Sequence, residues 1–278
     1  MQLHLKFIKI LSKYKYFIKI RLGLPKIIKT KQGKFFIRNP NETIQKCLLK
    51  SGEFEIKLVE LAIALAKQKE GTIVDIGANI GTFTIPLAHS FLLRDVFAFE
   101  PQRNIFHHLS ANIFINNLTN VISCRMAVGQ TFNNETKIEV PLFDFNENYT
   151  GSVTLDKYTA IKRSKIAGIA EPSLRSKQHD LVDLVNLDEI ELSEISLIKI
   201  DVEGMELSVL RSAERTIRRD LPIIFFETWD IPDFHDANCK IIDWLSVLGY
   251  VCFNFGNDSV ACHEKDTSSR KIIENILC

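Results

Sequence analysis

Apolar residues recur along the middle of the chain with two spacings, one typical of buried strands and one of amphipathic helices. Short apolar runs predict strands at 72–74, 96–99, 121–128, 196–200, 222–226, 250–255 and 259–263. Helical spacing predicts helices at 54–65, 82–89, 102–116, 203–219 and 240–248. Because strands alternate with helices, we expect an α/β fold with a doubly wound, mostly parallel seven-stranded sheet. The turn Phe255-Gly-Asn-Asp258 suits a hairpin, so the last two strands are predicted to be antiparallel.

The rhythm of strands and helices is interrupted twice, which predicts the organisation of the chain. Residues 1–50 form a predicted basic N-terminal extension with an amphipathic helix and a short β segment. Residues 51–278 form the main domain, with an insertion at about 130–180. Within the insertion, 137–142 and 151–155 have the pattern of short β segments. Residues 156–180 are polar and basic, and we predict that they form a mobile lid or acceptor-binding loop.

Charge is distributed unevenly along the chain. Residues 1–41 carry eleven Lys or Arg and no acid, which leaves 24 of the 35 bases against all 34 acids in the remainder. Over residues 1–24 lysines flank an apolar stripe at helical spacing, and we favour a helix packed against the body or a second subunit. Peripheral contact with an anionic membrane surface is the alternative. Lysines interrupt the apolar stretch, so a secretory signal is not expected and a cytoplasmic location is predicted.

The turn after the first strand carries the first candidate chemistry. It reads IVDIGANIGTFT over residues 73–84. Its glycines, Gly77 and Gly81, are four residues apart, whereas a dinucleotide-binding turn has the spacing G-x-G-x-x-G. Asp75 would repel a pyrophosphate but attract a cation, so S-adenosylmethionine, with its sulfonium and ammonium groups, suits this turn better than NAD. Glu100 ends the second strand, where an acid can bind ribose hydroxyls.

Several segments together resemble the FkbM family of class I, Rossmann-like methyltransferases. They are VDIGANIGTFT (74–84), FAFEPQ (97–102), ANIFINNLTNV (111–121), AVG (127–129), LIKIDVEGMELSVL (197–210) and PIIFFE (222–227). The resemblance covers about residues 50–230, and the I-D-V-E-G-x-E segment is its most specific part. It implies S-adenosylmethionine as cofactor and methylation mostly of hydroxyl oxygens, often on sugars or natural products. The predicted cofactor contacts are Asp75, Gly77, Ala78, Asn79, Gly81, Glu100 and Ala127.

Three acids follow two later strands and are the predicted catalytic residues. Asp201 and Glu203 come directly after the strand at 196–200, and Glu227 ends the next strand. Carboxyl ends of parallel strands share one edge, so these acids are expected to meet there. They can act as a base for an alcohol with supporting partners. An oxygen-rich Mg²⁺ site is the alternative, and no metal is predicted.

Each acid also has a structural interpretation. Glu203 can cap the helix that follows, Asp201 can hold the loop or the cofactor's amino group, and Glu227 can pair with a lysine. His235 is a further candidate base. Residues 150–152 either line the acceptor pocket or form a plain turn.

The predicted function is S-adenosylmethionine-dependent O-methylation of a sugar, glycan or natural-product acceptor. The alternatives are an N-methyltransferase, an RNA methyltransferase and a cofactor-binding module without catalysis. Nucleic acid is not the expected partner, because no basic patch interleaved with aromatic residues is present. The six cysteines are scattered without metal-like spacing, so no zinc site is predicted.

Overall fold

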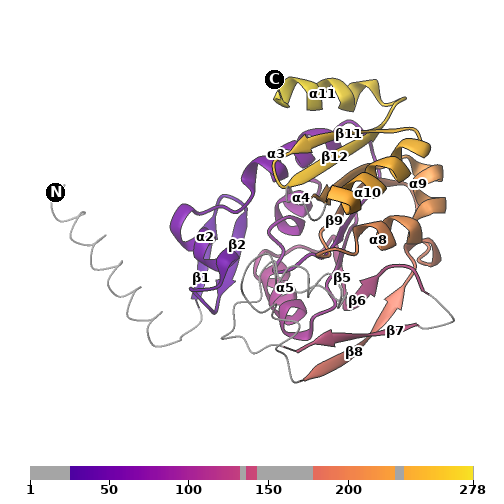
Figure 1. The fold of residues 1–278 in the computed structure, drawn as a ribbon. Helices are drawn as coiled ribbons and strands as arrows, with labels where there is room; N and C mark the ends of the chain where they lie inside the picture. The colour runs from indigo at the N-terminus through magenta and orange to yellow at the C-terminus, as the bar shows by residue number, and fades with distance from the viewer. Residues whose placement is uncertain (1–25, 132–135, 143–177, 229–234, 278) are drawn as a thin grey trace, which may run out of the picture.

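The computed structural model describes residues 26–131, 136–142, 178–228 and 235–277, and its centre is a seven-stranded sheet (Figure 1). The strands are β3 (Thr72–Ile76), β4 (Val96–Phe99), β5 (Val121–Cys124), β9 (Ile195–Ile200), β10 (Ile223–Glu227), β11 (Tyr250–Phe255) and β12 (Asp258–His263). Their order is β11-β12-β10-β9-β3-β4-β5, and β12 runs antiparallel to both of its neighbours. The predicted doubly wound sheet with its terminal hairpin is confirmed. Strand order reverses between β3 and β9, where such sheets form a binding crevice.

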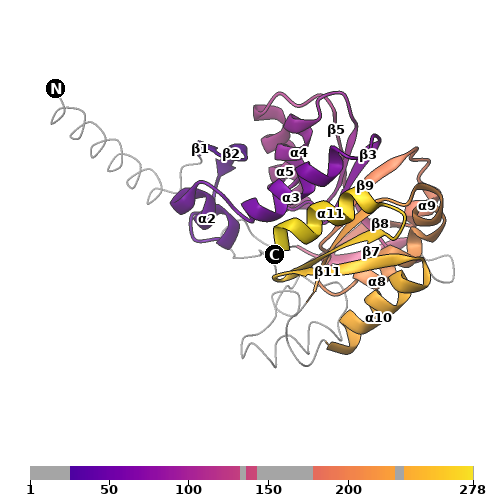
Figure 2. The same ribbon diagram turned by 90° about the horizontal axis from the view of Figure 1, so that it is seen from above.

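Helices cover both faces of this sheet (Figures 1 and 2). One face carries α3 (Ile56–Ala66), α4 (Thr84–Ser90), α5 (Arg103–Ile115) and α11 (Thr267–Leu277). The other carries α8 (Glu206–Ser212), α9 (Glu214–Asp220) and α10 (His235–Val247). Neighbouring strand residues alternate between the two hydrophobic cores, as Ile73 and Val74 do. Burial on both faces explains why the central strands are continuous apolar runs.

The predicted strand at 121–128 is wrong as a single element. It ends at Cys124 in the large sheet, and after Arg125 the chain enters a second sheet as β6 (Met126–Val128). That sheet has the order β6-β8-β7, with β7 at Lys137–Pro141 and β8 at His179–Val185. Asp180 on β8 forms ion pairs with both Arg103 and Arg125, which holds the chain where it changes sheets.

The predicted loop at 156–180 is wrong at its end, because His179 and Asp180 belong to β8. Pairing with β7 places them there, with His179 opposite Pro141. The other residues of that loop up to 177, and the predicted segments 151–155 and 150–152, lie outside the described residues.

The predicted helix at 203–219 is two helices, α8 and α9, separated at Ala213. The first N–H groups of α9 are capped from a distant part of the chain. Asp188 accepts hydrogen bonds from Arg215 N at 2.9 Å and from Thr216 N at 2.8 Å. A side-chain carboxylate at a helix start stabilises that end, so this tertiary contact favours a new helix over a continuous one.

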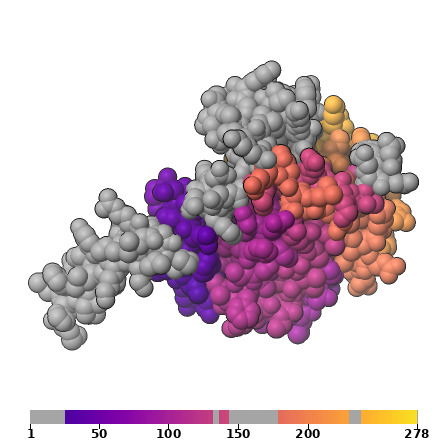
Figure 3. All heavy atoms as spheres, turned by 90° about the horizontal axis from the view of Figure 1, so that it is seen from below, coloured from indigo at the N-terminus to yellow at the C-terminus, as the bar shows by residue number. Residues whose placement is uncertain are grey.

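The N-terminal part is a hairpin of β1 (Lys26–Thr30) and β2 (Gly33–Ile37), followed by α2 (Thr43–Ser51). It packs on α5, and its indigo atoms lie against the magenta body in the space-filling view (Figure 3). Its apolar residues, including Phe35 and Leu48, belong to the same buried core as α3 and α5. α2 and α11 were not predicted. The domain boundary at residue 50 stays a prediction, and the predicted helix within 1–24 lies outside the described residues.

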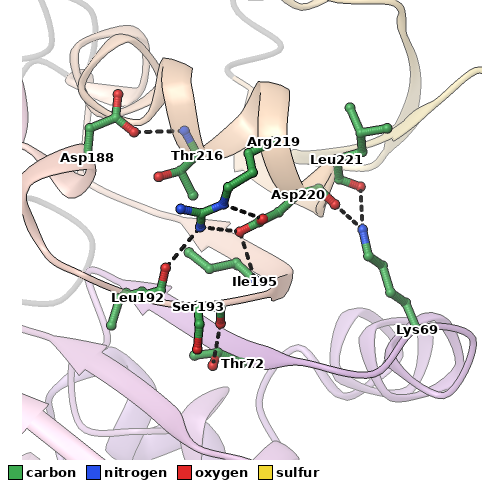
Figure 4. Close-up of polar contacts among 10 residues, drawn as sticks. All are labelled: Lys69, Thr72, Asp188, Leu192, Ser193, Ile195, Thr216, Arg219, Asp220 and Leu221. Carbon is green, nitrogen blue, oxygen red and sulfur yellow. Dashed lines mark hydrogen bonds and ion pairs between the residues drawn. The ribbon is translucent and has the colours of Figure 1, made fainter.

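At the amino ends of β3 and β9, hydrogen bonds tie the sheet to α9 (Figure 4). Ile195 N donates to Asp220 Oδ2 at 2.9 Å, and Arg219 donates to Leu192 O at 2.9 Å. Lys69 donates to the carbonyl oxygens of Asp220 and Leu221. These groups satisfy one another, so this edge anchors the central strands. In the part of the chain that the structure describes, no helix has the length and apolar character to cross a bilayer.

Candidate active site

A pocket opens at the carboxyl ends of the strands, beside the point where strand order reverses. Of the predicted site residues, it is lined by Gly77, Ala78, Asn79, Glu100, Ala127, Asp201, Glu203 and Glu227. Residues far apart in the chain, such as Ala78 after β3 and Glu203 after β9, therefore meet at one rim, as expected for parallel strands. The side chain of His235, at the start of α10, lies outside what the structure describes.

Asp75 and Gly81 are not among the residues that line the pocket. Asp75 is fully buried, and its Oδ2 accepts a hydrogen bond from Thr84 Oγ1 at 2.5 Å. Burial raises the pKa of Asp75, while the neighbouring Lys199 charge opposes that rise. At Gly81, with φ of +91°, a Cβ atom would lie 2.9 Å from the Leu109 side chain. Both residues therefore pack against the protein on the side of the turn away from the pocket. Cofactor contact by either residue stays a prediction.

Gly77 is required for a contact between two strand ends. Its φ is +85°, and a Cβ atom there would lie 1.8 Å from the carbonyl oxygen of Asp201. Asp201 N also donates to Ile76 O at 2.9 Å. The sequence suggested that a ligand comes close to this glycine, but the nearest group is the backbone at the end of β9. Gly77 thus sets the position of Asp201 relative to the glycine turn.

Glu100 joins the first turn to the second. Its Oε2 accepts from Asn79 N at 3.1 Å, and its Oε1 accepts from Gln102 N at 2.9 Å. Burial raises the pKa of Glu100 to about 7, although both N–H groups favour the ionised form. Its neighbours in the pocket include the apolar side chains of Phe99, Ile105 and Met126. The pocket thus combines this carboxylate with apolar side chains.

Asp201, Glu203 and Glu227 form a carboxylate cluster in the same pocket. One carboxylate oxygen from each lies within 4.8 Å of the others. Such a set can hold a divalent cation or bind hydroxyl groups. Glu203 has φ of +59°, an uncommon backbone conformation for a residue with a Cβ atom. α8 begins at Glu206 with Met205 in its N-cap position, so Glu203 does not hold that position.

Lys199 is a pocket residue that sequence reasoning missed. It is 5% exposed, its Nζ lies 2.9 Å from Asp201 Oδ2, and it lies over the Phe83 ring at 5.6 Å. Burial favours the neutral amine, but Asp201, Asp75 and Glu55 together raise the pKa of Lys199 above its ordinary value. Alternation along β9 places Lys199 on the same side as Asp201, which was the available signal.

The N-terminal part also contributes a wall that sequence reasoning missed. Ile44 on α2, Phe54 and Glu55 before α3, and Val59 on α3 line the pocket. None of them belongs to a motif. β2 packs on α5, and Gln32 at the turn of the hairpin binds the backbone N–H and carbonyl groups of Phe54, which holds this segment at the pocket.

Most of the residues that line the pocket lie in a part of the chain that matches a known family. A family model described as Methyltransferase FkbM domain matches residues 75–252. The chain is 26% identical over 171 residues to Methyltransferase 1 of Beauveria bassiana, a match that covers 58% of this chain and 61% of that protein. It is 25% identical over 171 residues to Methyltransferase sdnD of Sordaria araneosa, with 57% and 66% covered. The chain thus spans less than two thirds of both curated relatives.

Among solved structures, the chain is similar to a methyltransferase FkbM from Methylobacillus flagellatus. That likeness has 18% identity and a TM-score of 0.45, and it covers 70% of this chain and 44% of the other.

Proposed function

Because the chain belongs to the FkbM methyltransferase family, we propose that it transfers a methyl group from S-adenosylmethionine to a hydroxyl oxygen. The acceptor we propose is a sugar, glycan or natural product. The observation that carries the proposal is a single pocket that brings Glu100 and apolar side chains together with the carboxylate cluster of Asp201, Glu203 and Glu227.

Glu100 and the apolar residues of the pocket suit S-adenosylmethionine. Glu100 can accept hydrogen bonds from ribose hydroxyls, and Phe99, Ile105 and Met126 offer an apolar surface for a base. Gly77, Ala78, Asn79 and Ala127 complete that surface. Among the described residues that line the pocket, carboxylates outnumber lysines, which favours a ligand that carries a sulfonium and an ammonium group. When bound, this cofactor supplies a methyl group already activated for displacement.

The carboxylate cluster contacts the acceptor in this proposal. An alcohol must lose its proton as it is methylated, so a base within hydrogen-bond reach is needed. Asp201, Glu203 and Glu227 hold the acceptor hydroxyls. One of the carboxylates that line the pocket receives the proton. Lys199 holds Asp201 through its Oδ2 and thereby orients it. Holding the acceptor oxygen in line with the methyl carbon can itself contribute several kcal/mol.

The acidic cluster also bears on the alternatives. A phosphate backbone would be repelled by these carboxylates, which disfavours an RNA acceptor. An N-methyltransferase shares the cofactor site and differs only in the acceptor. A cofactor-binding module without catalysis would bind S-adenosylmethionine and yield no methylated product.

The test combines calorimetry with methyl transfer. We expect S-adenosylmethionine to bind and NAD not to bind. With tritiated S-adenosylmethionine and hydroxylated acceptors, Asp201→Asn should lower turnover by about 10²-fold, because a group that holds the acceptor in line is lost, while cofactor affinity is retained. Asp183→Asn is the matched control, because Asp183 is an exposed residue that pairs with Lys137 outside the pocket. Wild-type turnover in Asp201→Asn would show that Asp201 has no role in the reaction. Binding of NAD in place of S-adenosylmethionine would overturn the proposed function.

Glu203→Gln and Glu227→Gln test the other two acids in the same assay. A chelator distinguishes the two uses of the cluster. If activity is lost on chelation and regained with Mg²⁺, the acids hold a cation, whereas unchanged activity favours direct contact with the acceptor.

A further inference from the structure

One wall of the pocket carries an acid outside the matched family domain. Glu55 lies between α2 and α3, whereas the domain begins at residue 75. It lines the same pocket as Lys199, Asp201 and Glu227. The segment that carries it is held there by the hairpin, whose Gln32 binds the backbone N–H and carbonyl groups of Phe54.

The backbone of Glu55 is strained in a way that is typical of functional sites. Its φ of 49° and ψ of 37° are left-handed, a conformation that residues with a Cβ atom seldom adopt. Six non-glycine residues of the described chain have positive φ, and three of them, Glu55, Asn79 and Glu203, line the pocket. Glu55 also occupies the N-cap position of α3 but makes no side-chain capping bond. Its carboxylate is therefore not engaged in starting that helix.

The surroundings of Glu55 suit a proton acceptor. The residue is exposed by surface area yet has protein on most sides, as a side chain that faces an open pocket does. Burial, with the charges of Asp201 and Asp258, raises the pKa of Glu55 to about 7 against the opposing charge of Lys199. By contrast, Asp201 Oδ2 is bound to Lys199, and both oxygens of Glu100 accept backbone N–H groups. A general base works best when its pKa is near the working pH.

We infer that Glu55 is the general base for the proposed methyl transfer, supplied by the segment before α3 and not by the family domain. The acceptor oxygen bonds to the methyl carbon while the donor's carbon–sulfur bond breaks and leaves its electron pair on sulfur. The hydroxyl proton passes to the Glu55 carboxylate. The inference rests on the proposed function, because it assigns a role within that reaction.

The test compares Glu55→Gln with Glu60→Gln, an exposed glutamate further along α3 that lies outside the pocket. The acceptor probes are p-nitrophenyl glycosides with tritiated S-adenosylmethionine as donor. We expect Glu55→Gln to bind S-adenosylmethionine as the wild type does and to lose roughly 10²–10⁴ in turnover, while Glu60→Gln stays at the wild-type rate. Wild-type turnover in Glu55→Gln would overturn the inference and leave the proposed function standing. A wild-type protein that does not bind S-adenosylmethionine would instead overturn the proposed function.

A second measurement does not depend on finding an acceptor. The measurement is an NMR titration of protein labelled with ¹³C at the glutamate side-chain carboxyl. The resonance that is missing from the spectrum of Glu55→Gln belongs to Glu55, and its chemical shift is followed against pH. A midpoint near 7 supports the assigned role. A midpoint at about 4.3, the ordinary value for glutamate, would overturn it even if none of the glycosides is methylated.

Discussion

Gly77 and Asp201 lie at the carboxyl ends of neighbouring strands, and their backbones touch. A Cβ atom at Gly77 would lie 1.8 Å from the carbonyl oxygen of Asp201. The same glycine has φ of +85°, so any larger residue there meets both a strained backbone and a steric clash. The position of Asp201 in the pocket therefore depends on a residue with no side chain.

Gly77→Ala should destabilise the protein more than Gly52→Ala does. Gly52 has a similar φ of +75°, but a Cβ atom there would meet no other atom within 4 Å, so it isolates the cost of the backbone conformation. That cost is roughly 1–2 kcal/mol. The clash at Gly77 should add about 1–3 kcal/mol. Urea denaturation measures both free energies of unfolding, and equal losses would show that the strand ends can separate freely.

At the scale of elements, asparagine side chains at α5 form hydrogen bonds with the backbone of β2, as a neighbouring strand would. Asn112 Oδ1 accepts from Phe36 N at 2.7 Å, and Asn112 Nδ2 donates to Ile80 O at 2.8 Å. Asn116 Oδ1 likewise accepts from Lys34 N at 2.8 Å, and its Nδ2 donates to Lys34 O at 2.7 Å. The asparagines thus satisfy backbone groups along β2 and hold the hairpin against the body.

Asn112→Ala should cost about 2–4 kcal/mol, because it leaves a partly buried N–H and a buried carbonyl group without their partner. Asn112 is itself fully buried. Hydrogen exchange of the β1 and β2 amides should rise with the loss of stability. Ser110→Ala is the control on the same helix, since its hydroxyl donates to Phe106 O within the helix, and a change within about 0.5 kcal/mol is expected. Unchanged exchange in Asn112→Ala would mean that apolar packing alone holds the hairpin.

For the whole molecule, the concentration of acids around the pocket predicts how stability depends on pH. Burial raises the pKa of Glu55 and Glu100 to about 7 and that of Asp258 to about 6. Between about pH 4, where these groups ionise in the unfolded chain, and pH 7, the folded protein holds more protons. Stability must therefore fall as pH rises through this window. His108, whose pKa is lowered by burial, opposes the trend only below its ordinary value of 6.5.

Urea denaturation of the ligand-free protein should accordingly give a larger free energy of unfolding at pH 5 than at pH 8. Asp258→Asn should reduce the difference, because it removes one of the groups with a raised pKa. At still lower pH the trend reverses. For Asp220, burial is outweighed by hydrogen bonds from Arg219 and Ile195 N that lower its pKa, and this contribution is lost as pH falls through the folded value. Greater stability at pH 8 than at pH 5 would contradict the assignment of these pKa shifts.

The sequence by itself determined the central sheet and one rim of the pocket. The central strands, such as β3 and β9, are buried on both faces and are therefore continuous apolar runs, so they could be identified one by one. Parallel strands also place their carboxyl ends together, and for that reason Asp201, Glu203 and Glu227 could be assigned to the same edge as Asn79 and Glu100. These features depend on neighbouring residues and on a general rule of topology.

Only the tertiary structure decided the features that arise from contacts between distant segments. Asp188 divides the predicted helix at 203–219 by capping α9, and pairing with β7 makes His179 and Asp180 part of a strand. The hairpin, through Gln32 and its bonds to the Phe54 backbone, holds the segment of Glu55 at the pocket. Lys199 is buried beside Asp201, and Asp75 and Glu55 from distant segments add to the charges that favour its ionised form. In each case a group far away in the chain contributes free energy, and the local sequence does not show that contribution.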